Sequence, residues 1–262
     1  KARSSTAEVY AQVLADLQKA EQLLPEGTNR VRATKQTARA LLSRYYLYQK
    51  NWELAEEYAD KLIQNTSYTL IKPYSSFYAN NATATPESIF ELAYSATYPN
   101  SHRGNWQPPQ NGGTRQWAPN TAFLNLVRDP LIGGNRSALV NSTGDGRWYG
   151  TMYYRSPATD PAYVLRIAEM RLIRAEARAM QQDLDGALED LDAVRDRAGL
   201  TGSSAADIDE VLLAIENERR LEFAFEPHRW FDLLRADRAA AVLGVTDRNK
   251  YVLPIPVSEI II

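Results

Sequence analysis

The most constraining feature of this chain is the segment 218–235, which reads ERRLEFAFEPHRWFDLLR. Acids, arginines and large aromatic residues alternate in it too densely for a plain amphipathic helix or a solvated loop. Its acids recur every four residues on one helix face, with two arginines beside them: Glu218, Glu222, Glu226, Arg219 and Arg220. Buried charges are tolerated only when they are paired, so the segment predicts a closed network of acids and arginines within an aromatic core.

Pro227 predicts the end of this helix, because proline lacks the amide hydrogen that a helix interior requires. A second short helix is expected after it, and it would carry four further charged or aromatic residues: Arg229, Trp230, Asp232 and Arg235. We assign Trp230 to the core, and likewise Trp52 earlier in the chain.

The composition narrows the class of protein. The 262 residues suffice for one large domain or two small ones. Thirty Lys and Arg against 32 Asp and Glu give no electrostatic case for binding nucleic acid or an anionic membrane. The absence of cysteine excludes disulfides and thiolate metal sites. The chain opens with KARSSTAEVY, without a methionine or signal-like segment, so we expect a mature or trimmed piece of a longer protein.

Helical periodicity predicts a first helical block. Ser5 and Glu8 have the spacing of a capping box for a helix over 5–24, with Val9, Val13, Leu17 and Leu24 repeating on one face. Thr34 is expected to cap a helix that runs to Gln49, and Asn51 a third helix.

A second helical block is expected from Asp160–Pro161, read as an N-cap followed by proline at the first helical position, and to run to about Met180. Another helix should end near Gly199, and Ser204 and Asp207 should open the long helix that leads into residues 218–235.

The two blocks resemble each other. Ser43 and Ala55 lie twelve residues apart, as do Ala175 and Ala187, and each pair straddles a polar turn. Small residues at this spacing let antiparallel helices approach closely, as in a tetratricopeptide-like hairpin. Two unrelated helical hairpins are the alternative.

Residues 68–160 lack helical periodicity and are rich in Pro, Gly, Asn, Ser, Thr and aromatics. Only 123–129 reads as a short helix, and 88–95 as a buried strand. We therefore expect an all-α fold of tetratricopeptide-like hairpins with a long irregular, aromatic-rich insertion. The whole chain, 1–262, would form a single domain of three parts: 1–67, 68–160 and 161–262.

In this order the motifs resemble the SusD/RagB family of outer-membrane nutrient-binding lipoproteins. The matching segments are RATKQTARALLSRYYLYQKNWELAEEYADKLI (32–63), PESIFELAYS (86–95), VLRIAEMRLIRAEA (164–177), LDAVRDRAGL (191–200), residues 218–235, and a closing extended strip, YVLPIPVSEI (251–260). The chain departs from the family in three ways: the N-terminal portion with its lipidated cysteine is missing, the asparagine-rich tail is missing, and Pro227 stands where glycine is common.

The resemblance implies non-catalytic capture of a nutrient at the outer face of the outer membrane. The ligand would be a glycan or, in some members, a peptide. A SusC-like TonB-dependent transporter would be the partner on the helical-repeat side, and a lipid anchor outside this chain would provide the only membrane attachment.

The sequence shows no recognisable catalytic motif. We interpret the carboxylates of 216–226 as structural, because pairing with arginine lowers a carboxyl pKa and removes the proton that a general acid needs. There are two histidines, His102 and His228, and no G-x-S-x-G, H-E-x-x-H, P-loop or dinucleotide pattern. We expect no catalytic residue, no metal site and no cofactor.

Binding is the remaining function. Sugar rings pack their C–H faces on aromatic rings, and their hydroxyls pair with amides and guanidinium groups. The stretch 98–120 offers both, and its candidate ligand-binding residues are Trp106, Trp117, Arg103, Asn105, Asn111, Arg115 and Tyr98, with His102 a weaker candidate.

Three alternatives remain open. The rings of 98–120 could instead fill space under the loops; we favour exposure for Trp106, leave Trp117 undecided and assign Trp148 to packing. A helical-repeat scaffold that binds a protein partner is the rival function. A helical glycoside hydrolase would need two carboxylates facing each other across a cleft.

Overall fold

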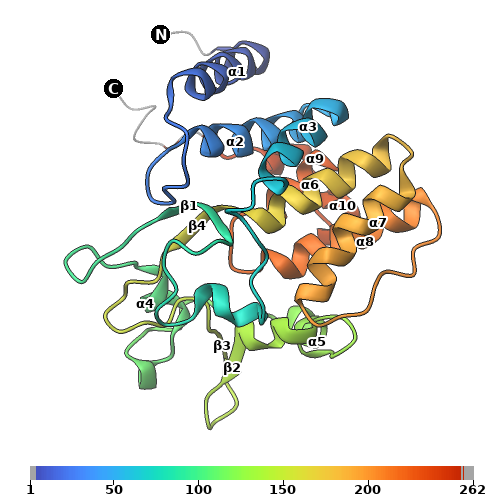
Figure 1. Cartoon of the computed structure of the whole chain (residues 1–262). Coiled ribbons are helices and arrows are strands. Elements are labelled where there is room, and N and C mark those ends of the chain that lie inside the picture. Colours follow the sequence, from blue (N-terminus) through green and yellow to red (C-terminus); the bar gives the residue numbers. More distant parts are fainter. Residues whose placement is uncertain (1–3, 255, 257–262) are drawn as a thin grey trace.

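The computed structural model describes residues 4–254 and 256. Its long helices lie in two blocks, one before and one after an irregular excursion that we define as residues 68–160 (Figure 1). The first block holds α1 (Thr6–Leu23), α2 (Lys35–Tyr48) and α3 (Trp52–Ile63). The second holds α6 (Ile167–Met180), α7 (Leu184–Arg197), α8 (Ile208–Glu222), α9 (Arg229–Arg235), α10 (Ala239–Leu243) and the 3₁₀ turn η4 (Arg248–Tyr251).

The helix starts follow their capping signals. Ser5 and Glu8 form the capping box of α1 with both reciprocal bonds present. Side chains that accept hydrogen bonds from the first turn also cap other helices, at Thr34, Asn51, Asn120, Asp183 and Asp207. The predicted starts of α1, α2, α3 and α8 are therefore confirmed.

The tetratricopeptide-like hairpins are confirmed. The hydroxyl of Ser43 in α2 donates to the carbonyl of Ala55 in α3 over 2.9 Å, and both residues are fully buried. Ala175 of α6 and Ala187 of α7 are also fully buried. Helix α3 packs on α6, so the two hairpins stack directly although the excursion separates them in the sequence (Figure 1).

The expected helix start at Asp160–Pro161 is wrong. Residues Ala162–Arg166 form a strand, β4, that pairs antiparallel with β1 (Ser88–Leu92), and α6 begins only at Ile167. Asp160 does not cap a helix; it is buried, and its Oδ2 accepts a hydrogen bond from the amide of Arg155 over 2.9 Å. Tertiary pairing with β1 has overridden a local helix signal here.

The excursion contains more structure than the sequence indicated. The predicted strand and short helix are present as β1 and α5 (Thr121–Arg128). Further short elements were not predicted: η1 (Tyr74–Tyr78), α4 (His102–Trp106), η2 (Pro109–Asn111), η3 (Gly134–Leu139), β2 (Val140–Ser142) and β3 (Trp148–Gly150), with β2 and β3 forming a hairpin.

Helix α1 lies differently from expectation. No residue of α1 is fully buried, and Val9 and Val13 of the predicted apolar face are exposed. The helix contacts the core through Leu17, which belongs to the predicted face, and through Leu14, which does not. Of the predicted closing strip, only 251–254 and 256 lie within the described residues.

A buried ionic network centred on Glu222 joins the excursion to the second block. Arg166 donates to Glu222 Oε1 over 2.8 Å, Arg136 to Oε2 over 2.9 Å, and Arg197 also to Oε1. Glu87, just before β1, accepts from Arg166 and Arg197 over 2.9 and 3.2 Å. Burial by itself would raise the pKa of Glu222, but the three guanidinium groups lower it to about 2, so the carboxylate stays ionised.

The predicted network therefore exists, but its partners are different. The glutamates of 218–235 pair with distant arginines, whereas Arg219 binds Asp232 over 2.9 Å and Arg220 makes no ion pair with any described residue. Helix α8 already ends at Glu222, and Phe225 turns the chain with φ +69°. Pro227 is thus not what ends the helix, and Glu226 reaches Arg166 from the following turn.

A second buried cluster lies where α9 begins. His228 stacks on Phe223 with ring centroids 4.4 Å apart, and its Nδ1 lies 4.0 Å from Glu169. Arg44 of α2 holds the same Glu169 through two bonds of 2.6 Å. Burial lowers the pKa of His228 to about 4, although Glu169 opposes the shift, so the imidazole is neutral at pH 7.

Replacing Glu222 by Gln should destabilise the protein by about 3–5 kcal/mol, because it leaves buried arginines without their shared carboxylate. Glu57→Gln is the matched control: Glu57 forms an exposed pair with Lys61, whose loss should change the free energy of unfolding by less than about 1 kcal/mol. Urea unfolding measures both variants, and equal losses would contradict the role given to the network.

The protein should lose stability as the pH falls from 6.5 to 4. Since the pKa of His228 is about 4 in the fold and near its ordinary 6.5 when unfolded, the unfolded chain binds the extra proton in this interval. The expected loss is roughly 3 kcal/mol. In the His228→Gln variant, the free energy of unfolding should depend much less on pH between 6.5 and 4. In the His102→Gln variant, most of this pH dependence should remain. A flat wild-type profile would exclude this effect.

Candidate functional site

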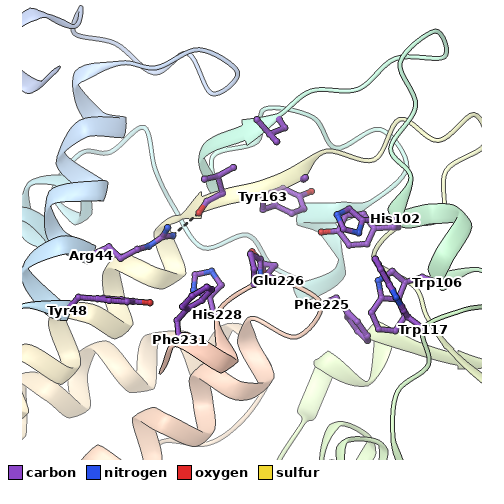
Figure 2. Close-up of a pocket in the computed structure, with 15 residues that line it drawn as sticks. Arg44, Tyr48, His102, Trp106, Trp117, Tyr163, Phe225, Glu226, His228 and Phe231 are labelled. Atoms are coloured by element: carbon purple, nitrogen blue, oxygen red, sulfur yellow. Dashed lines mark hydrogen bonds between the residues drawn. The ribbon is translucent and has the colours of Figure 1, made fainter. Parts of the chain in front are cut away.

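A large cavity lies between the helical blocks and the excursion. Its volume is about 840 Å³, within the range of about 300–1,000 Å³ typical of small-ligand sites. Figure 2 shows the side chains of one end, His102, Trp106, Trp117 and Phe225, and those of the other end, Arg44, Tyr48, His228 and Phe231. We call this the aromatic cavity.

The excursion end is a wall of interlocked rings. Trp106 packs edge-on against Phe225 with centroids 4.5 Å apart, and Trp117 against Trp106 at 5.6 Å. Gly150 permits this packing, since a Cβ there would lie 3.0 Å from Trp106 and 3.1 Å from Phe225. Trp106 is consequently half-buried, whereas Trp117 remains 41% exposed. The exposed indole of Trp117 is thus supported by the packed indole of Trp106.

His102 joins the wall from the first turn of α4. Its imidazole stacks on Tyr153 with centroids 4.9 Å apart and lies 5.5 Å from Trp117. Burial lowers the pKa of His102 below its ordinary value, which favours the neutral ring at pH 7. A neutral imidazole offers both a hydrogen-bond donor and an acceptor.

The helical end combines a fixed cation with exposed rings. Arg44 is held by Glu169 and by the carbonyl of Val164, to which it donates over 2.8 Å (Figure 2). These bonds use its Nε and Nη2, and Nη1 has no partner among the described residues. Phe231, 49% exposed, lies beside it at the cavity rim. Arg44 can therefore donate to a ligand without moving.

One carboxylate lines the cavity among the described residues. Glu226 accepts from Arg166 Nη2 over 2.6 Å and from its Nε over 3.1 Å. Burial raises the pKa of Glu226 although Arg166 opposes the shift. A carboxyl fixed in this way, without a second one facing it, does not make the pair that glycoside hydrolysis requires.

The predicted ligand residues fall into different places. Trp106 and Trp117 come together in the aromatic cavity, while the remaining five do not line it: Arg103, Asn105, Asn111, Arg115 and Tyr98. Arg103 donates to the carbonyl of Asn111 over 2.6 Å, and Arg115 to that of Trp148 over 2.8 Å. Both guanidinium groups brace the excursion.

The other predicted residues lie outside this cavity as well. The carbonyl of Asn105 accepts from the amide of Trp117 over 3.1 Å, and Tyr98 is 77% exposed away from it. Asn111 lines a separate cavity, described below. The expected exposure of Trp106 is not observed, because Phe225 covers one side of its ring.

Sequence reasoning missed the helical end of the cavity. Arg44 and Tyr48 lie one turn apart on α2, and Phe231 lies on α9. Their positions in the sequence fit ordinary amphipathic helices. The one signal that could have identified them is an aromatic residue next to a basic residue on a helix face that is expected to be exposed. Phe225 and His228 belong to the segment 218–235, whose many charged residues led to a purely structural interpretation.

The described part of the chain has neither a metal-binding cluster nor a membrane-spanning helix. Residues 4–254 and 256 contain no cluster of three or more His, Cys, Asp or Glu side chains placed to hold a metal. The helices there are all too short or too polar to cross a bilayer.

Two family models match the sequence. The model described as "SusD family" matches residues 140–252, and the one described as "Starch-binding associating with outer membrane" matches 1–47. The SusD-like protein P2 of Formosa agariphila is 25% identical in an alignment that covers 97% of this chain and 63% of the relative. The SusD-like protein P38 of the same organism is 24% identical, with 93% and 60% covered. The chain thus spans about three fifths of these relatives.

Solved structures share the fold. A SusD superfamily protein from Bacteroides vulgatus has a TM-score of 0.81 at 22% identity, covering 95% of this chain and 62% of that one. A laminarin-binding SusD-like protein has a TM-score of 0.81 at 24% identity, covering 98% and 68%. The surface glycan-binding protein A from Bacteroides thetaiotaomicron, in complex with laminarihexaose, has a TM-score of 0.76 at 22% identity, covering 96% and 68%.

The family models, the alignments over most of this chain and the shared helical architecture agree, and the chain belongs to the SusD/RagB family.

Proposed function

We propose that the chain binds a glycan in the aromatic cavity without cleaving it. The observation that carries the proposal is the exposed indole of Trp117, backed by Trp106 and faced across the cavity by Arg44. A pyranose ring would lie with its C–H face on the indole, and its hydroxyls would reach the guanidinium and imidazole groups.

The similar proteins support this ligand class. One solved relative is described as laminarin-binding and another was solved with laminarihexaose, and a matching family model is described as starch-binding. Laminarin and starch are both neutral glucose polymers. We therefore favour a neutral glycan over a peptide as the ligand of this cavity.

The partner and location follow from the family. We propose that the chain acts at the outer-membrane surface and delivers its ligand to a SusC-like TonB-dependent transporter. The description "associating with outer membrane" supports the location. The whole protein's partners depend also on parts that its relatives have beyond the aligned region.

The aromatic cavity also favours glycan capture over a purely scaffolding role. A scaffold would present ring faces along a groove of the helical blocks. A groove on these blocks has a single ring, Trp52, among eight charged residues, several of them paired with one another. The clustered rings lie instead between the blocks and the excursion.

Replacing Trp117 by Ala should weaken glycan binding at least about tenfold, because stacking on an aromatic ring contributes about 1 kcal/mol beyond the area it buries. A glycan array would select the ligand, and calorimetry would measure its affinity. Tyr98→Ala is the matched control, since Tyr98 is exposed outside the cavity and its loss should leave the affinity unchanged. If the two variants bind equally well, the indole is not the platform.

The purified chain should release no new reducing ends from laminarihexaose or starch oligosaccharides. Glu226, the carboxylate of the cavity, is held by Arg166 and has no facing carboxyl among the described lining residues. Turnover that is abolished in a Glu226→Gln variant would show instead that the cavity is catalytic.

A further inference from the structure

A second cavity lies in the excursion, behind the wall of the aromatic cavity. Its volume is about 370 Å³. Two pairs of neighbouring residues divide between the cavities: Trp106 and Tyr153 line the aromatic cavity, whereas Gln107 and Tyr154 line the second one. Because neighbouring residues of these two segments line different cavities, the segments form a wall shared by both cavities.

Buried hydrogen bonds hold this wall in place. Gln107 is 1% exposed, and its Nε2 donates to the carbonyls of Gly150 and Tyr153, each over 2.9 Å. Its Oε1 accepts from Asn111 Nδ2 over 2.9 Å. Arg103 ties the backbone of Asn111 to the same region, since its Nε donates to the carbonyl of Tyr154 over 3.4 Å. The second cavity is therefore preformed.

The second cavity carries no charge. Among the described residues its lining consists only of tyrosine, amide, hydroxyl and alanine side chains, with Tyr149, Tyr154, Asn111, Asn141 and Ser75 as its main features. The aromatic cavity, by contrast, contains Arg44 and Glu226. Without a charged group, this surface gives no specific recognition of phosphate, carboxylate or amine ligands.

Its polar groups suit hydroxyls. Asn111 uses its Nδ2 on Gln107, which leaves its Oδ1 as an acceptor without a partner among the described residues. Asn141 uses its Oδ1 on the amide of Ser142 over 2.8 Å, which leaves its Nδ2 as a donor. Tyr154 is 37% exposed and offers a ring face with a hydroxyl. A ligand that both donates and accepts around an apolar ring face matches this set.

We propose that the second cavity is an additional carbohydrate site, specific for an uncharged sugar unit. This inference rests on the proposed glycan-binding function and adds a location and a ligand class to it. A polysaccharide offers many units, so two sites on one protein increase its avidity for a long chain above that of either site alone.

The test is nuclear magnetic resonance of the chain with labelled tyrosine rings and tryptophan indoles. The probes are the neutral sugars glucose, galactose, mannose and laminaribiose, with glucuronate as the charged control. We expect a neutral sugar to shift the Tyr149 and Tyr154 signals saturably, and glucuronate to bind there at least threefold more weakly. Tyrosine signals that stay unmoved while the indoles of Trp106 and Trp117 respond would overturn the second site alone.

Variants separate the two sites. Tyr154→Ala should weaken the affinity reported by Tyr149 at least fivefold and leave the indole shifts unchanged, and Asn141→Ala should act in the same direction. Trp117→Ala should leave the tyrosine shifts within twofold, as should Tyr98→Ala, which removes an exposed ring outside both cavities. Loss of the tyrosine shifts in Trp117→Ala would mean a single site. If neither the tyrosine nor the indole signals shift with any probe, both the glycan-binding function and this inference are overturned.

Discussion

The carboxylate of Glu222 is the contact on which the arrangement of this protein depends. Three arginines converge on it from three separate segments: Arg136 from the excursion, Arg166 from β4 and Arg197 from α7. All four groups are buried, and an unpaired ion in such a place is far less stable than in water. None of the three segments can move alone without leaving a charge uncompensated. Phe77 covers the guanidinium group of Arg166 and Tyr74 that of Arg197, each at 4.6 Å, so ring faces enclose the network.

The same network positions the aromatic cavity. Arg166 ends β4, and its bonds to Glu222 and Glu226 fix both that strand and the turn after α8. The strand supplies the cavity with Tyr163 and Val164, and the turn supplies Phe225 toward the tryptophans and His228 toward Arg44 (Figure 2). A rigid ionic core thus sets the distance between the two ends of a cavity whose own walls are apolar. Preorganisation of this kind lets stacking and hydrogen bonds contribute to affinity without first ordering the site.

Charge distinguishes the surfaces of the molecule. The groove around Trp52 on the helical blocks has charged residues of both signs. The aromatic cavity has two fixed charges, Arg44 and Glu226, and the cavity behind it has none among the described residues. Removing a charged group from water costs free energy. A cavity without charges therefore favours a neutral, hydroxyl-rich ligand, whereas a groove with many charges favours a polar protein surface as its partner. The excursion thus separates two chemically different cavities with one wall braced by Gln107.

Near neighbours along the chain already specify part of this structure. Helix caps such as Ser5 and Asp207 follow from spacings of a few residues, and the close contact of Ser43 with Ala55 follows from a spacing of twelve. The composition of 98–120 gives that stretch its aromatic character. The sequence also indicated that the acids of 218–235 must be paired, but not with which arginines. Long-range packing sets the rest: Asp160 precedes a strand, Arg103 and Arg115 brace loops, and Arg44 and Phe231 face Trp117 across one cavity. The physical reason is that hydrogen bonds and apolar burial are satisfied by whichever groups the fold brings together, and these groups lie far apart along the chain.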